Sequence, residues 1–281
     1  DQFYDTLQAA LPETGIEHVV VTRAIDLLPQ PKKTLLTAVT KVLGKRPSLP
    51  AQGIISFTDM LAGQSAYPSH TPAYDDISAL QYTGGTTGVS KGVMLTQGSL
   101  MSNVAQTMDM VSAGGRSVKY FTTVSPLPLY HIYAWMLNMG LMPATRGHSV
   151  LIPDPRNIPM FVGAIKSLKF EIFCGLNSLF VALLQDSKFQ KLDFSKLQIT
   201  LSGGMALMDA VAHEWHEATG CVVSEGYGMT ESSPVISMNP SGHEKIGTAG
   251  IPLSGTEIKV VDENGVEQDV GGVGELCVRG A

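Results

Sequence analysis

The densest group of residues that could do chemistry lies between Tyr82 and Gly92, in the sequence YTGGTTGVSKG. This segment carries four glycines, four Thr or Ser hydroxyls and Lys91. Glycines let backbone N–H groups turn toward an anion, hydroxyls add hydrogen-bond donors, and a lysine adds a mobile positive charge. The segment lacks the Gly-Lys-Ser/Thr ending of a Walker A loop and the G-x-G-x-x-G pattern of a dinucleotide site. We therefore interpret it as a loop of another type that binds a triphosphate.

A strand must end just before this loop to position it, and Ser78–Thr83 is predicted to be that strand. From Ile77 to Met238, short apolar strands alternate with longer helical segments. Such alternation is typical of βαβ units, in which helices cover both faces of a parallel sheet. The expected helices are Gly98–Val111, Ile158–Leu168, Ser178–Leu184 and Met208–Ala218, and the further expected strands are Ser149–Ile152, Ile172–Cys174, Leu197–Leu201 and Val222–Glu225.

The two ends of the chain differ from this central part. Near the start, the residue pattern favours a strand within Ile16–Thr22 and a helix within Thr34–Leu43. After Gly247, Glu257–Val261 and Glu275–Arg279 alternate with period two, with a turn and no helix between them. We predict an α/β domain over residues 1–246 and part of a small β-rich subdomain over residues 247–281.

Composition and charge exclude several classes of protein. Of the 281 residues, 44% are hydrophobic and 16% are charged, whereas disordered chains need high charge and few apolar residues. The net charge of −6 argues against nucleic-acid binding, which requires a basic surface. Cys174, Cys221 and Cys277 lie far apart among apolar residues, as reduced, buried cysteines of a cytosolic protein do. Prolines interrupt the uncharged stretch Phe121–Thr145, so we expect a core or pocket segment and not a membrane span.

Four motifs together resemble the adenylate-forming superfamily, which includes acyl-CoA synthetases, nonribosomal adenylation domains and luciferases. In the family's order, they are the loop at 82–92, PLYHIYAW at 128–135, GYGMTE at 226–231 and GELCVRG at 274–280. LPLYHI at 127–132 and EGYG at 225–228 are most similar to bacterial long-chain fatty acyl-CoA synthetases. The resemblance covers essentially the whole chain. It implies an α/β fold with a layered αβαβα core and mostly parallel sheets.

The resemblance also implies a nucleotide site. Glu231 would bind Mg²⁺ with the Thr83 hydroxyl as its partner, because a hard cation that bridges phosphates prefers oxygen ligands. Thr230 would donate to the α-phosphate, Lys91 would neutralise phosphate charge, and the Tyr227 ring would stack on adenine. The residues implied to bind ATP are Thr83, Gly84, Gly85, Thr86, Thr87, Gly88, Lys91, Gly204, Glu225, Gly226, Tyr227, Gly228 and Thr230.

For the acyl group, the resemblance points to His131 and Trp135. His131 would lie beside the reacting carboxylate, and Trp135, one helical turn later, would gate a fatty-acid tunnel. Because apolar and aromatic residues surround both side chains, plain core packing is the alternative for each. The implied catalytic group is His131, Thr230, Glu231 and Lys91.

The activity that the resemblance implies is ATP-dependent activation of a long-chain fatty acid. Attack of the carboxylate on the α-phosphorus would give an acyl-adenylate and pyrophosphate, and the CoA thiol would then displace AMP. ATP and Mg²⁺ would be the cofactors and CoA the co-substrate. Electrostatic and positional catalysis would suffice without a protein nucleophile.

Two other function classes stay open. One is another adenylate-forming enzyme, such as a fatty acyl-AMP ligase or an aryl or medium-chain acyl-CoA ligase. The other is a nucleotide-binding remnant without catalysis. The family's opening segment, its ribose-binding aspartate and its mobile C-terminal domain with a catalytic lysine are not found in these 281 residues. We therefore expect that this polypeptide alone does not complete acyl-CoA synthesis.

The expected location is the cytoplasm, with possible peripheral contact at the inner face of a membrane, and a homodimer is possible. A basic cluster near the start of the chain contains no acidic residue, although such a cluster is usually a solvated face. It consists of Lys32, Lys33, Lys41, Lys45 and Arg46.

Overall fold

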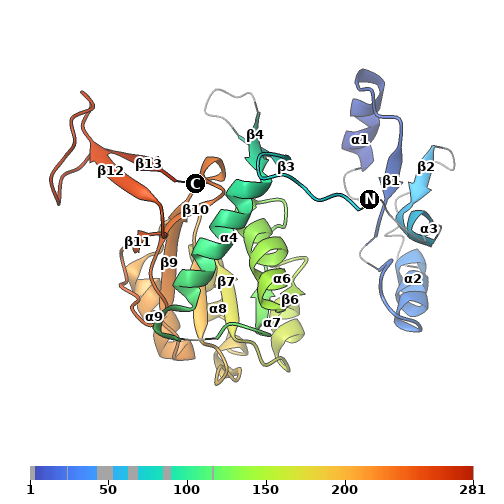
Figure 1. Ribbon diagram of the computed structural model, residues 1–281. Coiled ribbons are helices and arrows are strands. Elements are labelled where there is room, and N and C mark those ends of the chain that lie inside the picture. Colours follow the sequence, from blue (N-terminus) through green and yellow to red (C-terminus); the bar gives the residue numbers. More distant parts are fainter. Residues whose placement is uncertain are drawn as a thin grey trace. The chain divides into compact units, whose positions relative to one another are not determined.

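The computed structural model describes residues 4–23, 25–42, 53–62, 69–84, 90–115 and 117–280 (Figure 1). The chain forms two compact units, Asp1–Thr71 and Pro72–Ala281. The second unit contains both the α/β core and the β-rich tail. Gly85, Thr86, Thr87 and Gly88, which the sequence assigns to ATP binding, lie outside the described residues.

The first unit is built around two short parallel strands. Strand β1 pairs with β2 in register, Val19 opposite Ile54. None of the residues of this unit whose burial is described is fully buried. The expected strand and helix are both present, as β1 and α2. The elements are α1 (Tyr4–Ala10), η1 (Leu11–Glu13), β1 (Val19–Val21), α2 (Lys32–Val42), β2 (Ile54–Ser56) and α3 (Phe57–Ala62).

A seven-stranded, mostly parallel sheet forms the centre of the second unit, in the order β11-β10-β9-β8-β7-β5-β6. Five strands, β5 to β9, run parallel, which confirms the predicted βαβ arrangement. Strand β10 pairs antiparallel with both of its neighbours, β9 and β11. The sequence missed β5, β10 and β11. The strands are β5 (Thr122–Ser125), β6 (His148–Leu151), β7 (Ile172–Gly175), β8 (Ile199–Ser202), β9 (Val223–Gly228), β10 (Val235–Met238) and β11 (Ile251–Pro252).

Helices cover both faces of this sheet, because successive strand residues point to opposite sides. On β7, Phe173 packs into a cluster with Trp215, whereas Ile172 and Cys174 pack into a second cluster with Leu137. The mixed α/β class is thereby confirmed. The helices of this unit are α4 (Gln97–Val111), η2 (Ala113–Gly115), α5 (Ile132–Trp135), the π-helix η3 (Met136–Leu141), α6 (Met142–Thr145), α7 (Ile158–Ile165), α8 (Asn177–Leu184), η4 (Phe189–Lys191), α9 (Asp209–Thr219) and η5 (Thr230–Ser232).

The strand before the phosphate loop does not belong to the parallel sheet, so that part of the prediction was wrong. Strand β3 (Ile77–Thr83) pairs antiparallel with β4 (Lys91–Thr96) in a separate two-stranded sheet, with Thr83 opposite Lys91. The physical reason is the connection length, because a parallel pair needs a crossover of about a dozen residues or more. The glycine-rich segment is therefore the connection of a hairpin.

The tail forms a second antiparallel hairpin, as the period-two pattern predicted. Strand β12 (Glu257–Val261) pairs with β13 (Glu275–Arg279), with Lys259 opposite Cys277. Cys277 is only partly buried, which differs from the expectation that all three cysteines are buried, whereas Cys174 and Cys221 are buried.

The uncharged stretch Phe121–Thr145 folds into β5, α5, η3 and α6. Leu137, Leu141 and Met142 from this stretch pack in the core, which confirms the expected core or pocket segment. Within the part of the chain that the structure describes, no helix is both long and apolar enough to cross a membrane.

Candidate active site

A cavity of about 530 Å³ opens where the carboxyl ends of β8 and β9 meet the β3–β4 hairpin and the start of α5. The open ends of parallel strands are the usual place for a ligand in an α/β fold. Ten of the residues that the sequence singled out line this cavity together. They are Thr83, Gly84, Lys91, His131, Gly204, Gly226, Tyr227, Gly228, Thr230 and Glu231.

Two glycines shape the cavity wall after β8 and β9. Gly204 has a φ of +80°, a left-handed conformation that side chains rarely adopt, so the turn after β8 requires glycine. A Cβ on Gly228 would clash with the carbonyl oxygen of Pro234. The chain after β9 therefore folds back closely onto itself, which brings the following residues to the cavity.

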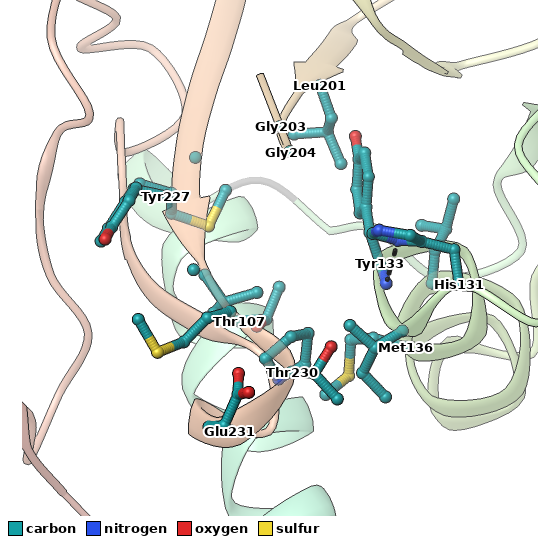
Figure 2. A pocket seen from close by; sticks show the side chains of 18 of the residues that line it. Thr107, His131, Tyr133, Met136, Leu201, Gly203, Gly204, Tyr227, Thr230 and Glu231 are labelled. Atoms are coloured by element: carbon teal, nitrogen blue, oxygen red, sulfur yellow. Dashed lines mark hydrogen bonds between the residues drawn. The ribbon is translucent and has the colours of Figure 1, made fainter. Parts of the chain in front are cut away.

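Those following residues form a tight loop that carries Thr230 and Glu231. The Met229 backbone N–H donates to the Pro234 carbonyl at 3.0 Å, and the Ser232 hydroxyl donates to the same oxygen at 2.5 Å. Thr230 and Glu231 line the same cavity as His131 (Figure 2). Glu231 is exposed, so its carboxylate is open to a ligand.

The oxygen ligands that Glu231 and Thr83 offer to the cavity suit Mg²⁺. The Glu231 carboxylate and the Thr83 hydroxyl belong to residues that line the same cavity. Among the described residues, no group of three or more His, Cys, Asp or Glu side chains could hold a metal by itself. Mg²⁺ commonly keeps several waters and binds through one or two carboxylates plus substrate phosphates, so a single carboxylate fits it.

His131 is exposed at the cavity and does not pack in the core. It caps the start of α5, and its Nδ1 accepts a hydrogen bond from the Tyr133 backbone N–H at 3.3 Å (Figure 2). Because Nδ1 acts as an acceptor, the proton of a neutral imidazole lies on Nε2. That nitrogen can then donate a hydrogen bond to an acid group of a ligand.

Trp135 does not line the cavity. It packs against a small cluster formed by Leu95, Leu100 and Ile132, next to the β3–β4 hairpin. Tyr133, two residues after His131, lines the cavity instead and was missed by the sequence reasoning. Its position in the same motif as His131 was the available signal.

Burial strongly affects the Tyr133 phenol and the thiol beside it. Burial raises the pKa of Tyr133 well above its ordinary value, and it raises the pKa of Cys174 to about 12. Both groups therefore stay neutral near pH 7. Sulfur is a weak hydrogen-bond partner, so the Cys174 thiol leaves the hydroxyl of Tyr133 poorly satisfied.

Part of the cavity lining is almost entirely apolar, and three of its residues lie in the stretch Phe121–Thr145, which was expected to be a core or pocket segment. We call this region the apolar end. Thr107, on α4, adds a buried hydroxyl there. The apolar end is suited to a hydrocarbon and not to a charged group, because it offers few polar contacts. Its residues are Thr107, Met136, Leu137, Leu141, Leu201, Val235 and Met238.

Glu225 is not among the residues that line the cavity. Its carboxylate accepts a hydrogen bond from the Gly247 backbone N–H at 3.0 Å, and its carbonyl accepts one from Asn239 N–H at 2.9 Å. These contacts connect β9 to the segment that leads into the tail.

Curated relatives of the chain include long-chain-fatty-acid–CoA ligases. The protein from Haemophilus influenzae is 38% identical over 283 residues, which cover 99% of this chain and 50% of that protein. The protein from Escherichia coli O157:H7 is 39% identical over 287 residues, with the same coverage of 99% and 50%. The chain therefore spans about half the length of the curated relatives it matches.

Solved structures share the fold. An anthranilate CoA ligase in complex with anthranoyl-AMP superposes with a TM-score of 0.83 at 24% identity, over 100% of this chain and 49% of that chain. ATP-bound MatB from Rhodopseudomonas palustris superposes with a TM-score of 0.72 at 25% identity, over 98% of this chain and 52% of that one. The family model described as "AMP-binding enzyme" matches residues 4–281. By motifs, fold and sequence, the chain belongs to the family of AMP-binding enzymes.

Proposed function

We propose that the full-length protein is a long-chain fatty acid–CoA ligase, and that this chain supplies its nucleotide- and acyl-binding core. The observation that carries the proposal is the combination inside one cavity. Thr83 and Lys91, which flank the phosphate loop, line this cavity. Thr230, Glu231, His131 and the apolar end line the same cavity. A nucleotide and a fatty acid would therefore meet with their reacting groups adjacent.

The proposed reaction has two steps. An oxygen of the fatty acid carboxylate attacks the α-phosphorus of ATP, the bond to the β-phosphate breaks, and pyrophosphate leaves. The thiolate of CoA then attacks the acyl carbon of the adenylate, and AMP leaves with the electrons of the broken C–O bond.

The residues of this chain bind and orient the reactants. Lys91 and the Thr230 hydroxyl stabilise the negative charge that develops on the phosphates. Mg²⁺, held by Glu231 and Thr83, supplies further neutralisation of phosphate charge when bound. His131 donates from Nε2 to the acid group and holds it toward the nucleotide, which is a positional contribution.

The apolar end supports a fatty acid as the acid. Hydrocarbon binding gains free energy with the apolar surface that leaves water, about 25 cal/mol per Å². A polar or charged acyl tail would lose its hydration there without gaining partners, since apolar side chains dominate the lining. The shared identity with long-chain-fatty-acid–CoA ligases supports the same class of acid.

The test is ATP-dependent thioester formation by the full-length protein with CoA and acids from short to long chain. We expect kcat/KM to rise with chain length and the products to be acyl-CoA, AMP and pyrophosphate. Accumulation of acyl-AMP without thioester would instead identify a fatty acyl-AMP ligase. A preference for aryl or short acids, or no turnover with any acid, would contradict the proposal.

We also propose a cytoplasmic location with peripheral contact to an anionic membrane, through helix α2. All three cysteines are free, as expected in a reducing compartment. Residues 27–58 contain five basic residues and no acidic residue, although the whole chain has a net charge of −6. On α2, Leu35 and Val42 are 65% and 86% exposed. A basic helix with an outward apolar face favours an anionic lipid surface, where fatty acids are also concentrated.

A further inference from the structure

A buried asparagine on α4 pairs with the backbone of the strand that follows the Thr230–Glu231 loop. Asn103 is 4% exposed. Its Nδ2 donates to the Val235 carbonyl at 2.7 Å, and its Oδ1 accepts from the Val235 N–H at 3.0 Å. The same Nδ2 also donates to Gln106 Oε1 at 3.2 Å. One side-chain amide thus satisfies both backbone groups of a single residue.

Val235 needs this partner because the strand pairing is irregular there. The register between β9 and β10 shifts between Val235 and Ser237. A β-bulge leaves backbone groups of the bulged strand without their ladder partners. Leaving such groups buried and unpaired is costly, so the Asn103 amide takes the place that a neighbouring strand would occupy.

The paired residue, Val235, lies immediately beyond the loop that carries Thr230 and Glu231. Pro234, the residue before Val235, accepts the two hydrogen bonds that close the loop around Thr230 and Glu231. The loop is therefore closed onto Pro234, and Asn103 ties the next residue, Val235, to helix α4. A shift of Val235 would move the loop with it.

The N-terminal end of α4 is joined directly to the phosphate-loop hairpin. Strand β4 starts at Lys91, and the Thr96 hydroxyl at its end caps α4 by accepting from the Ser99 N–H at 3.1 Å. Helix α4 crosses one face of the sheet (Figure 1). It thus connects the hairpin with Lys91 and Thr83 to the loop with Glu231.

We propose that Asn103 is a positioning residue, which fixes Thr230 and Glu231 relative to Lys91 and Thr83 and so sets the affinity for Mg²⁺ and ATP. This inference rests on the proposed function of the cavity. Asn103 does not line the cavity, so it acts through Val235 and not through contact with a reactant.

The test compares two variants of the full-length protein with a matched control. Asn103→Ala removes both hydrogen bonds, and Asn103→Asp keeps the acceptor for the Val235 N–H but removes the donor. The control, Thr200→Val, removes the buried acceptor of Trp215 Nε1, 3.1 Å away, in the opposite core cluster. All three variants lose buried hydrogen bonds, but only the Asn103 variants lose bonds to Val235, the residue that follows the loop with Thr230 and Glu231.

We expect Asn103→Ala to raise the KM for ATP and the Mg²⁺ concentration for half-maximal activity by about tenfold, since a buried backbone pair loses its partner. Asn103→Asp should also raise both values, because a carboxylate oxygen then faces the Val235 carbonyl in place of a donor. The KM for the fatty acid should stay unchanged in both. Thr200→Val should lower the melting temperature without shifting either the ATP or the Mg²⁺ dependence.

A second measurement reports on positioning without requiring activity. Amide hydrogen exchange should become faster at residues 229–235 in Asn103→Ala, while β8 stays protected. Unchanged exchange, or a uniform loss of activity that follows the melting temperature as in Thr200→Val, would overturn the proposal. A wild type without ligase activity would refute the proposed function, and the exchange result would still decide the role of Asn103.

Discussion

Helices α2 and α4 are both amphipathic, but they turn opposite faces toward the residues around them. On α4, Leu100 and Val104 are 0% and 5% exposed and face the protein interior. On α2, Leu35, Val39 and Val42 are exposed, whereas the polar residues Lys33, Thr37 and Thr40 are partly buried. Helix α4 buries its apolar stripe, and α2 presents its own to the outside.

The surroundings of the two helices explain the difference. Helix α4 has the seven-stranded sheet and η3 beside it, and its residues Met110 and Val111 join the core cluster with Leu137. Helix α2 belongs to a unit with a two-stranded sheet, which offers too little apolar surface to build a core of its own. Periodicity therefore predicts a helix and its stripe, but the neighbouring elements decide which face is covered.

The largest expected effect compares one leucine from each helix. Leu100→Ala should lower the free energy of unfolding by about 2–5 kcal/mol, because it leaves a cavity in a packed cluster. Leu35→Ala should change it by no more than about 0.5 kcal/mol, because the side chain is already exposed. Urea unfolding of the full-length variants measures both, and similar losses at the two positions would remove the distinction between the helices.

Alkaline pH should sharpen the contrast between the two units. The pKa of Cys174 is raised from 9.0 to about 12, and burial is the main cause. Since the folded state holds the thiol proton more tightly, this contribution to stability is complete below pH 9 and is lost as the pH rises toward 12. Burial raises the pKa of Tyr133 in the same direction.

We therefore expect the second unit to lose stability progressively above pH 9 in urea titrations. The first unit contains no cysteine and lacks this contribution. Replacement of Cys174 by Ala should flatten the alkaline slope. A slope that stays the same in Cys174→Ala would show that the thiol is not the titrating group.

The smallest expected effect on stability concerns the outer face of α2. Val39→Ser combined with Val42→Ser should leave the melting temperature nearly unchanged but weaken binding of the full-length protein to vesicles of phosphatidylglycerol and phosphatidylcholine. Lys32→Gln combined with Lys41→Gln should weaken vesicle binding more strongly at low salt than at high salt. Thr34→Ser, at an exposed polar position of α2, is the matched control.

Two outcomes would contradict the membrane proposal. Vesicle binding that is equal in all variants would exclude α2 as the contact. A drop in melting temperature in the Val39→Ser, Val42→Ser variant would show that another part of the full-length protein covers this face, and a change in oligomeric state would assign it to a second copy of the chain.

Much of the α/β core could be predicted from local sequence. Strands such as Ile172–Gly175 are short, apolar and followed by helices, so their type and parallel direction follow from pattern alone. Strand β4 was missed because Met94 is exposed and Gly92 weakens the strand signal after the glycine-rich loop. Its antiparallel pairing with β3 depends on a short connection, which the alternation of elements did not reveal.

The polar part of the site was more predictable than its apolar part. Thr230, Glu231 and His131 lie in compact motifs, so the residues around them indicated their chemistry. The apolar end draws on α4, η3, β8 and β10, which are distant in sequence, and single apolar residues carry no local signal. Glu225 and Trp135 lie in the same motifs, yet neither lines the cavity, because neighbours in sequence point in different directions.

The most direct test of the account is fatty acid-dependent exchange of labelled pyrophosphate into ATP by the full-length protein, in the wild type and in Glu231→Gln. We predict exchange that requires both a long-chain acid and Mg²⁺, and a loss of at least about a hundredfold in Glu231→Gln, which removes the carboxylate proposed to hold the metal. Wild-type exchange that proceeds without the acid, or exchange that Glu231→Gln leaves intact, would contradict it.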